Sequence, residues 1–284
     1  AVDGGTDRDV AQRQVVAGLD VGPDAGLHAG ALGQVLRRDD VALLAVGVVQ
    51  QWDPRGAVRV VLDVRDLRRH AVLVVTTEKI SFSSSFGAED QVLTDLLVTT
   101  KKSISIFTLD TGRLPYETYD LMHKVNEKYK INVDVYFPKN VNVQSLYKDQ
   151  GINGFYDSVQ NRKECCFVRK IEPLRRALEG VQVWITGLRA QQSVTRKDLE
   201  LFEWDDGLKI IKLNPLIAWS EEEIWEYIKK HKLPYNKLHD EGFPSIGCAP
   251  CTRAVEAGED VRSGRWWWEE PEHKECGLHI KDQT

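Results

Sequence analysis

Short apolar runs alternate with longer amphipathic stretches along the chain from residue 78 onward. Four of these runs have the length and the β-branched or aromatic content that buried strands show. They lie at 79–83, 103–109, 132–137 and 181–186. The pattern therefore predicts four short strands, the last of which is ended by Gly187.

Amphipathic stretches accompany these predicted strands. Residues 88–98 bring four apolar side chains to one helical face, and 115–130 begins with a proline at a position that helices tolerate. Ser220 and Glu223 form a capping box for a further helix that runs to about residue 231. Such alternation is typical of α/β proteins, so we expect an open, mostly parallel, Rossmann-like sheet that binds ligands at the carboxyl ends of its strands.

Polar residues and glycines follow three of the predicted strands. They are Ser83, Ser84, Ser85, Gly87, Glu89 and Asp90 after the first strand, Asp110 and Gly112 after the second, and Gly187, Arg189, Gln192, Ser193 and Arg196 after the last. Small residues between a strand and a helix let backbone N–H groups approach an anion. One serine-rich turn also fits a plain helix cap, and it is neither a Walker loop nor a dinucleotide fingerprint. Three such strand ends together indicate a nucleotide site.

The first 77 residues differ in composition from the rest of the chain. They contain no Lys, Glu, Ser, Asn, Ile, Phe, Tyr, Cys or Met, all of which occur from residue 78 onward. We interpret 1–77 as a segment that is either appended or, preferably, mistranslated from a GC-rich gene, and we assign it no function. Its apolar runs at 41–49 and 58–64 can still form strands or helices. The predicted domains are 1–77, the main domain 78–260 and a C-terminal tail 261–284.

Charge and hydropathy exclude some classes of protein. The formal net charge of −5 argues against a general nucleic-acid binder. No apolar run reaches the length of a bilayer, and the first residues lack a signal-peptide pattern. We therefore expect a cytoplasmic protein that binds neither nucleic acid nor membrane and keeps its thiols reduced.

The five cysteines divide into four and one. Cys165 and Cys166 are adjacent, Cys248 and Cys251 form a C-x-x-C pair, and Cys276 lies apart in the tail. Four thiolates can hold a metal centre, and the fifth is left as a nucleophile. An adjacent pair suits an iron–sulfur cube better than a tetrahedral zinc ion, because neighbouring side chains diverge. Zinc and inert buried thiols remain alternatives to the cluster at this stage.

Seven motifs in order resemble the assimilatory adenosine 5′-phosphosulfate (APS) reductases of the thioredoxin-dependent bacterial type. They are Ser-Phe-Gly-Ala-Glu-Asp, Leu-Asp-Thr-Gly-Arg, Cys-Cys-x-x-Arg-Lys-x-Glu-Pro-Leu, Thr-Gly-x-Arg-x-x-Gln-Ser-x-x-Arg, Gly-Cys-x-Pro-Cys-Thr, Gly-Arg-Trp-Trp-Trp-Glu and Glu-Cys-Gly-Leu-His. The ordered set is very specific and covers the chain from residue 79 to its end. Residues 1–77 lie outside the match, where the family normally has helices.

The resemblance implies a fold like that of the adenine nucleotide α-hydrolases and one 4Fe–4S cluster per chain. The ligands of the cluster would be Cys165, Cys166, Cys248 and Cys251. The family reduces APS to sulfite and AMP in sulfate assimilation and cysteine biosynthesis. In that reaction Cys276 would attack the sulfate sulfur and form an S-sulfocysteine, which thioredoxin then resolves. We also expect a homo-oligomer.

The same resemblance assigns cations to the substrate. A thiolate that attacks an anionic sulfate needs positive charge to offset the repulsion, and the departing phosphate needs it as well. The candidates are Arg169, Lys170, Arg189, Arg196, Arg262 and Arg265. Lys170, four residues beyond Cys166, is expected to link the negative charge of the cluster to the substrate. No chemical role is predicted for His239.

Three other functions share parts of this pattern. A 3′-phosphoadenosine 5′-phosphosulfate (PAPS) reductase has the same loops and tail cysteine but lacks the four cluster cysteines. An iron–sulfur enzyme that transfers sulfur to tRNA needs a Ser-Gly-Gly-x-Asp-Ser loop, which Phe86 and Ala88 interrupt here. A non-catalytic redox sensor has no use for Cys276 beside Arg262 and Arg265. APS reduction is therefore the preferred interpretation.

Overall fold

The structure is a computed structural model, and it describes only part of the chain in detail. Side chains are described in 79–99, 104–192, 199–256, 258–270 and at 274. In the N-terminal region the backbone alone is described, and only within five strands.

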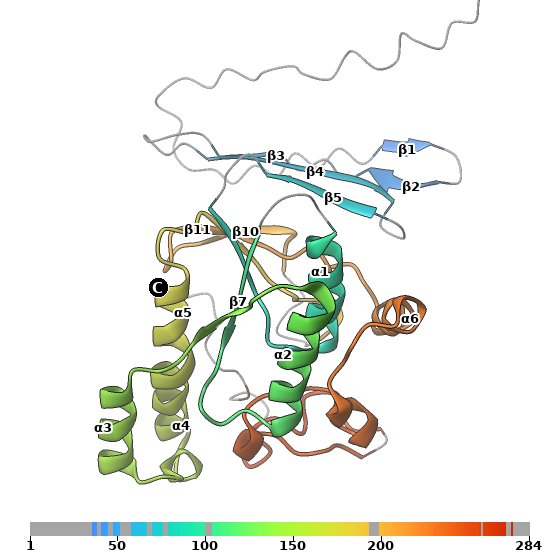
Figure 1. The fold of residues 1–284 in the computed structure, drawn as a ribbon. Helices are drawn as coiled ribbons and strands as arrows, with labels where there is room; N and C mark the ends of the chain where they lie inside the picture. The colour runs from blue at the N-terminus through green and yellow to red at the C-terminus, as the bar shows by residue number, and fades with distance from the viewer. Residues whose placement is uncertain are drawn as a thin grey trace, which may run out of the picture. The chain divides into compact units, whose positions relative to one another are not determined.

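Those five N-terminal strands form two small antiparallel sheets. Their bounds are β1 Leu36–Arg38, β2 Val41–Leu44, β3 Val48–Gln51, β4 Val58–Asp66 and β5 His70–Val75. Strand β1 pairs with β2, and β4 lies between β3 and β5 (Figure 1). The described parts of the apolar runs at 41–49 and 58–64 are thus strands rather than helices, as their many valines favour.

The main domain contains a six-stranded sheet in the order β10-β11-β9-β6-β7-β8. The bounds are β6 Ile80–Ser83, β7 Ser105–Leu109, β8 Asp134–Tyr136, β9 Val183–Ile185, β10 Phe202–Asp205 and β11 Ile210–Leu213. All neighbours are parallel except the edge strand β10, which runs antiparallel to β11. The predicted open, mostly parallel sheet is confirmed, and β10 and β11 extend it beyond the four predicted strands.

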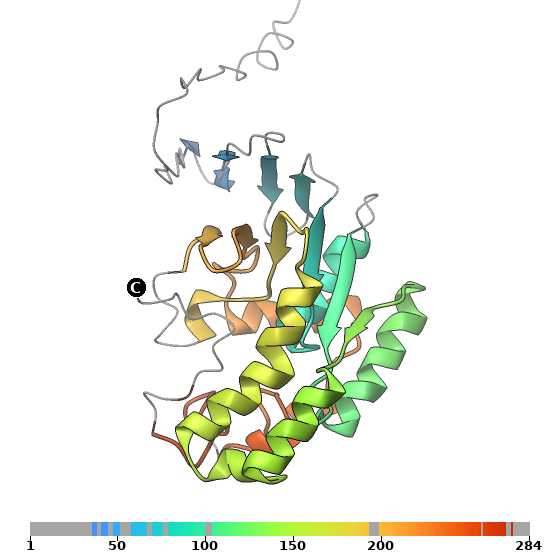
Figure 2. The same cartoon turned by 90° about the vertical axis from the view of Figure 1, so that its left-hand side faces the viewer.

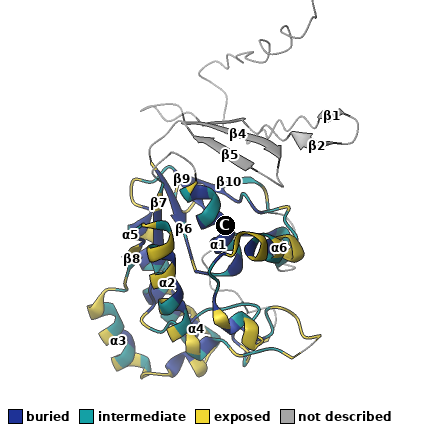
Figure 3. Cartoon of the chain, turned by 45° about the vertical axis from the view of Figure 1, so that its right-hand side comes forward, coloured by how far each residue is buried: buried dark blue, intermediate teal, exposed yellow. Residues whose placement is uncertain are grey.

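Helices cover both faces of this sheet. The α-helices are α1 Ala88–Val98, α2 Tyr116–Tyr129, α3 Asn140–Gln150, α4 Val159–Cys166, α5 Glu172–Ala177 and α6 Glu221–His231. Side chains that alternate along a strand point to opposite faces, and β7 shows the consequence. Ile106 joins the core formed with α1, α2 and α6, whereas Phe107 joins a second core with α5. The central strands β6 and β9 are accordingly mostly buried, whereas the edge strand β8 is not (Figure 3).

Helices α4 and α5 form one continuous rod, joined by the π-helical segment η2, Phe167–Ile171 (Figure 2). Ser158 caps the start of the rod by accepting a hydrogen bond from the backbone N–H of Asn161. Short π-helical segments inside α-helices occur frequently at functional sites. Here the segment directly follows Cys166 and contains both Arg169 and Lys170.

Short 3₁₀ turns complete the domain. They are η1 Gly154–Tyr156, η3 Ala190–Gln192, η5 Lys237–Glu241 and η6 Ala249–Cys251. In the part of the chain that the structure describes, no helix combines the length and the apolar character needed to cross a bilayer.

Candidate active site

A cavity of about 730 Å³ lies at the carboxyl ends of β6, β7 and β9. Its wall includes Ser83 at the end of β6, Leu109 at the end of β7, and Gly187 just beyond β9. The 3₁₀ turn η5 and the segment 244–247 line it as well, together with Arg262, Arg265 and Trp266. The cavity therefore occupies the edge of the sheet at which the sequence predicted a nucleotide, and we call it the nucleotide cavity.

The serine-rich loop is held together by one buried carboxylate. Asp90, in the first turn of α1, accepts hydrogen bonds from the backbone N–H of Ser85 at 2.6 Å and from its hydroxyl at 2.7 Å. Burial raises the pKa of Asp90 to about 7, although the hydrogen bonds from Ser85 oppose that shift. Phe86 has a left-handed backbone with φ of 61° and turns the chain from β6 into α1.

Gly187 must be a glycine because Asp90 lies directly against it. A Cβ atom at this position would lie 2.2 Å from Oδ1 of Asp90, far inside any real contact distance. Helix α1 and the turn after β9 can therefore approach one another only without a side chain at residue 187.

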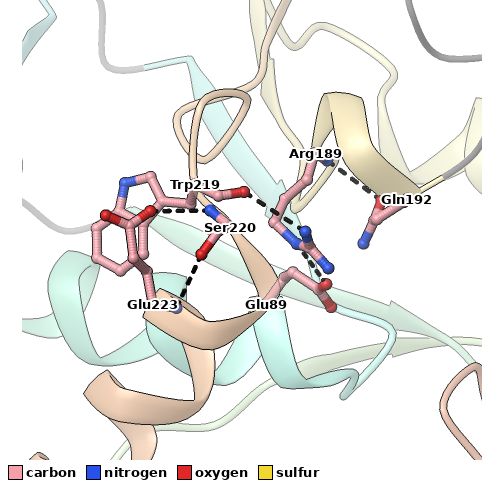
Figure 4. Close-up of polar contacts among 6 residues, drawn as sticks. All are labelled: Glu89, Arg189, Gln192, Trp219, Ser220 and Glu223. Atoms are coloured by element: carbon pink, nitrogen blue, oxygen red, sulfur yellow. Dashed lines mark hydrogen bonds and ion pairs between the residues drawn. The ribbon is translucent and has the colours of Figure 1, made fainter.

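Arg189 lines the nucleotide cavity, but it is also an ion-paired residue. Its Nε donates to Glu89 at 2.8 Å and its Nη1 donates to the carbonyl of Trp219 at 3.4 Å, while Gln192 accepts from its backbone N–H (Figure 4). Ser220 and Glu223 form the predicted capping box at the start of α6, and that prediction is confirmed. The contacts of Arg189 therefore connect α1, the turn after β9 and the residue before the cap of α6 at the nucleotide cavity.

Two arginines near the start of the C-terminal tail, Arg262 and Arg265, line the nucleotide cavity. Nη1 of Arg265 donates to the hydroxyl of Ser245 and to the carbonyl of Ile246, both at 3.3 Å. A Cβ atom on Gly247 would lie 2.3 Å from the guanidinium of Arg265, so that arginine lies flat on the 245–247 turn. The guanidinium carbons of Arg265 and Arg262 lie 4.7 and 5.9 Å from the ring centre of Trp266.

A second, smaller cavity is lined by four of the five cysteines. Cys165 and Cys166 come from the end of α4, while Cys248 precedes the short turn η6 and Cys251 is its last residue. Its other lining residues are Arg113, Phe155, Arg162, Arg169, Lys170 and Pro250. We call it the cysteine cavity.

The donors of the cysteine cavity fit the predicted cluster. All four residues are thiols and none forms a disulfide. Among the described residues no three Cys, His, Asp or Glu side chains are arranged to hold a single metal ion. A cube with an iron at each of four corners takes thiolates that are further apart than those around one tetrahedral ion. Cys165 and Cys166 at the end of α4 and the C-x-x-C pair at η6 are the four thiols that would hold such a cube.

The surroundings shift the pKa values of Cys248 and Cys251 in opposite directions. Burial opposes ionisation of Cys248, but Lys170, a hydrogen bond with Thr111 at 3.2 Å and further arginines lower its pKa overall. Burial raises the pKa of Cys251 to about 12, with Cys248 adding to the effect. The positive side chains around the cavity are suited to balance a thiolate-bound cluster, whose net charge is negative.

The nucleotide cavity and the cysteine cavity share parts of their walls. Lys170 lines both cavities. Trp266 lines the first and packs in the same apolar cluster as Cys248 and Cys251. Thr111 also lines the nucleotide cavity while its hydroxyl contacts Cys248.

Some predicted substrate residues lie away from the nucleotide cavity. Asp110 is buried and accepts hydrogen bonds from the backbone N–H of Gly112 at 2.7 Å and from the hydroxyl of Tyr119 at 2.9 Å, so it shapes the loop. Gly112 likewise does not line the cavity, and Arg169 lines the cysteine cavity instead. The predicted residues Ser193, Arg196 and Cys276 lie outside the described residues.

The sequence did not reveal every residue of the cavity wall. Thr111, His239 and the turn 245–247 all line it. Burial lowers the pKa of His239, which packs edge-on against Trp225 at 5.2 Å. The Gly-Phe-Pro-Ser-Ile-Gly run before Cys248 is a turn signal, but nothing in the sequence shows which strand ends it faces.

The strand order, the cavity at the carboxyl edge and the serine-rich loop before α1 define an open, mostly parallel α/β fold with a ligand cavity at the ends of its strands. The family model of the phosphoadenosine phosphosulfate reductase domain matches residues 79–254. The chain belongs to this family, and its predicted resemblance to the APS reductases is confirmed by its relatives.

Two relatives and one solved structure illustrate the match. The chain is 54% identical to the adenosine 5′-phosphosulfate reductase of Allochromatium vinosum over 72% of its own length and 80% of the relative. It is 48% identical to the enzyme of the same name from Burkholderia cepacia, covering 73% of this chain and 83% of that one. The phosphoadenylyl-sulfate reductase of Candida auris, solved with phosphate, superposes with a TM-score of 0.55 at 31% identity, covering 63% of this chain and 85% of the other.

Proposed function

We propose that this protein reduces adenosine 5′-phosphosulfate to sulfite and AMP in sulfate assimilation. The observation that carries this proposal is the shared wall of the two cavities: four cysteines lie beside a nucleotide cavity, with Lys170 lining both. The names of the relatives supply the substrate. In PAPS reduction the substrate carries a 3′-phosphate, and the four-cysteine set favours APS over it.

The reaction that we propose begins with Cys276. Its thiolate attacks the sulfate sulfur, so that an S–S bond forms, the bond from sulfur to the phosphate oxygen breaks, and AMP leaves with that oxygen. A thioredoxin thiolate then attacks Sγ of Cys276 and releases sulfite. The second thioredoxin thiol resolves the mixed disulfide and returns Cys276 to its thiol. The two electrons come from the thioredoxin dithiol, and this requires the reduced thiols of the cytoplasm.

The described residues support the binding step of this mechanism. Arg262, Arg265 and Lys170 bring positive charge to the nucleotide cavity, where a phosphosulfate develops negative charge on its leaving oxygen. The loop at Ser84 and Ser85 lies at the start of α1, where backbone N–H groups favour an anion. Cys165, Cys166, Cys248 and Cys251 would hold a 4Fe–4S cluster, which would supply a fixed local charge rather than the electrons.

The test separates the nucleophile from the cluster. Cys276→Ser keeps the volume of the residue but replaces a soft thiol by a hydroxyl that is barely ionised at neutral pH. Wild type incubated with sulfur-labelled APS and no thioredoxin should hold the label covalently and release it as sulfite when thioredoxin is added. Cys276→Ser should keep its iron, bind AMP as wild type does, and hold no label.

The matched variant Cys165→Ser should lose iron, because it removes one of the proposed cluster ligands. Loss of iron from Cys276→Ser, or a labelled adduct on it, would contradict the proposal. Comparable turnover of APS and PAPS at low concentration would count against the proposed preference for APS.

A further inference from the structure

One buried ion pair joins the rod that carries the adjacent cysteines to the segment that carries the cavity arginines. Nε and Nη2 of Arg162, in α4, donate to the two carboxylate oxygens of Glu269 at 2.9 and 2.7 Å. The side chains of this pair are 1% and 2% exposed. A two-point bond between a guanidinium and a carboxylate fixes orientation as well as distance, and removal of one partner from a buried pair is costly.

Arg162 also contacts the residue that connects the two cavities. Its guanidinium lies 4.9 Å from the ring centre of Trp266, and the guanidinium groups of Arg265 and Arg262 lie near the same ring. In addition, Arg162 lies near Cys166, one helical turn further along α4. Three guanidinium groups therefore surround one indole ring between the cysteine cavity and the nucleotide cavity.

The backbone at Trp266 needs this support. Its φ of 43° places a bulky residue in the left-handed region, a strained conformation that persists only where the surroundings impose it. The N–H of Trp266 donates to the carbonyl of Cys251 at 3.0 Å, and the N–H of Glu269 donates to the carbonyl of Trp266 at 2.8 Å. The Arg162–Glu269 pair anchors the far end of this turn.

We infer that Arg162 and Glu269 are positioning residues for the anion end of the nucleotide cavity. By holding the turn at Trp266 against α4, they keep Arg265 and Arg262 where a second anionic group beyond the α-phosphate is bound. This inference rests on the proposed function, because it takes that anionic group to be the sulfate of the substrate.

The test compares two nucleotides, AMP and ADP, whose β-phosphate stands in for the sulfate. Dissociation constants are measured by calorimetry on the full chain with Glu269→Gln and with Arg162→Lys. The lysine keeps the charge but cannot make the two-point bond. Each variant should weaken ADP binding at least tenfold and AMP binding less than threefold, so that the preference for ADP shrinks.

The chain offers a matched control in the ion pair of Glu203 and Lys212, which is also buried and joins β10 to β11 outside the cavity wall. Glu203→Gln should lower the melting temperature but leave the ratio of the two dissociation constants unchanged. The inference would be wrong if the ratio of the ADP and AMP dissociation constants stayed at its wild-type value in both folded test variants. It would also be wrong if that ratio changed equally in Glu203→Gln. If Glu269→Gln yields no folded protein, Arg162→Lys decides the question alone.

Failure of the wild type to bind either nucleotide is a different outcome. It would overturn the proposed function and the inference together. A change confined to the variants, by contrast, concerns the positioning role alone.

Discussion

The contacts of Asp90 with Ser85 and Gly187 determine the geometry of the loop before α1. Asp90 holds Ser85 by two hydrogen bonds, and the missing side chain of Gly187 gives Asp90 its room. Both residues line the nucleotide cavity, so the shape of the loop that we propose to bind an anion depends on this contact.

We expect Gly187→Ala to destabilise the protein by roughly 1–3 kcal/mol, as overpacking of a tight interior contact does. The new methyl would displace the Asp90 carboxylate, so AMP binding should weaken as well. Gly87→Ala, in the loop before α1, is the matched control, since its Cβ would meet its nearest neighbour at an ordinary 3.5 Å. Urea unfolding and calorimetry measure both effects, and equal behaviour of the two variants would contradict the prediction.

Asp90 should also make stability depend on pH. Its pKa rises from 3.8 to about 7 on folding, so between these values the folded chain binds a proton that the unfolded chain has lost. Stability should therefore fall as pH rises through this window, by up to about 1.4 kcal/mol for each pH unit. Asp90→Asn keeps an acceptor for Ser85 but cannot ionise.

The measurement is urea unfolding of wild type and Asp90→Asn at pH 5 and at pH 8. The asparagine variant should gain stability relative to wild type at the higher pH. An identical difference at both pH values would show that Asp90 keeps an ordinary pKa.

At the scale of elements, α3 supports the π-helical segment of the rod. The hydroxyl of Tyr147 accepts from Nη2 of Arg169 at 2.8 Å and from Nη2 of Arg113 at 3.2 Å. Both arginines line the cysteine cavity, and Nη1 of Arg169 donates to the carbonyl of Thr111 at 2.6 Å. One phenol on α3 therefore orients two cations toward the cysteines.

Tyr147→Phe removes that acceptor and leaves the ring in place. We expect a loss of about 1.5–3 kcal/mol, the range for a hydrogen bond to a charged group. If the proposed cluster is bound, its reduction potential should shift to more negative values, because its cations are held less firmly. Voltammetry and urea unfolding measure the two effects.

Tyr129→Phe is the control, since Tyr129 donates to Asp95 at 2.8 Å between α2 and α1, away from the cysteine cavity. It should lower stability without a change in potential. A shift of potential in the control, or none in Tyr147→Phe, would refute the role that we assign to Tyr147.

At the scale of the whole molecule, the six-stranded sheet and the lining of both cavities come from described residues between Ile80 and Trp266. A chain that begins at Glu78 should therefore bind AMP with the affinity of the full chain. Calorimetry of the two proteins under identical conditions tests this. A large loss of affinity in the shorter chain would show that residues 1–77 contribute to the site.

The elements that could be predicted from the sequence are those with a strong local signal. The strands at β6, β7, β8 and β9 are short and apolar, α1 and α2 are amphipathic, and the cap of α6 is a two-residue motif. Such signals depend on neighbours within one turn or one strand, so the chain alone expresses them. Strand β10 and the rod were not predicted, because their pairing and their π-helical segment depend on distant partners.

The residues of the candidate site also fall into two groups, those that the sequence predicted and those whose place only the tertiary structure revealed. Residue types and spacing marked the cysteines, the serine loop and the arginines, because thiols, small residues and cations are needed for that chemistry wherever they lie. Only the tertiary structure gave Asp110 and Arg189 hydrogen-bonded roles, brought His239 into the cavity wall, and paired Arg162 with Glu269. Arg162 and Glu269 are 107 positions apart. Contacts between residues so far apart in sequence arise from packing of the sheet and its helices, and no local pattern in the chain encodes them.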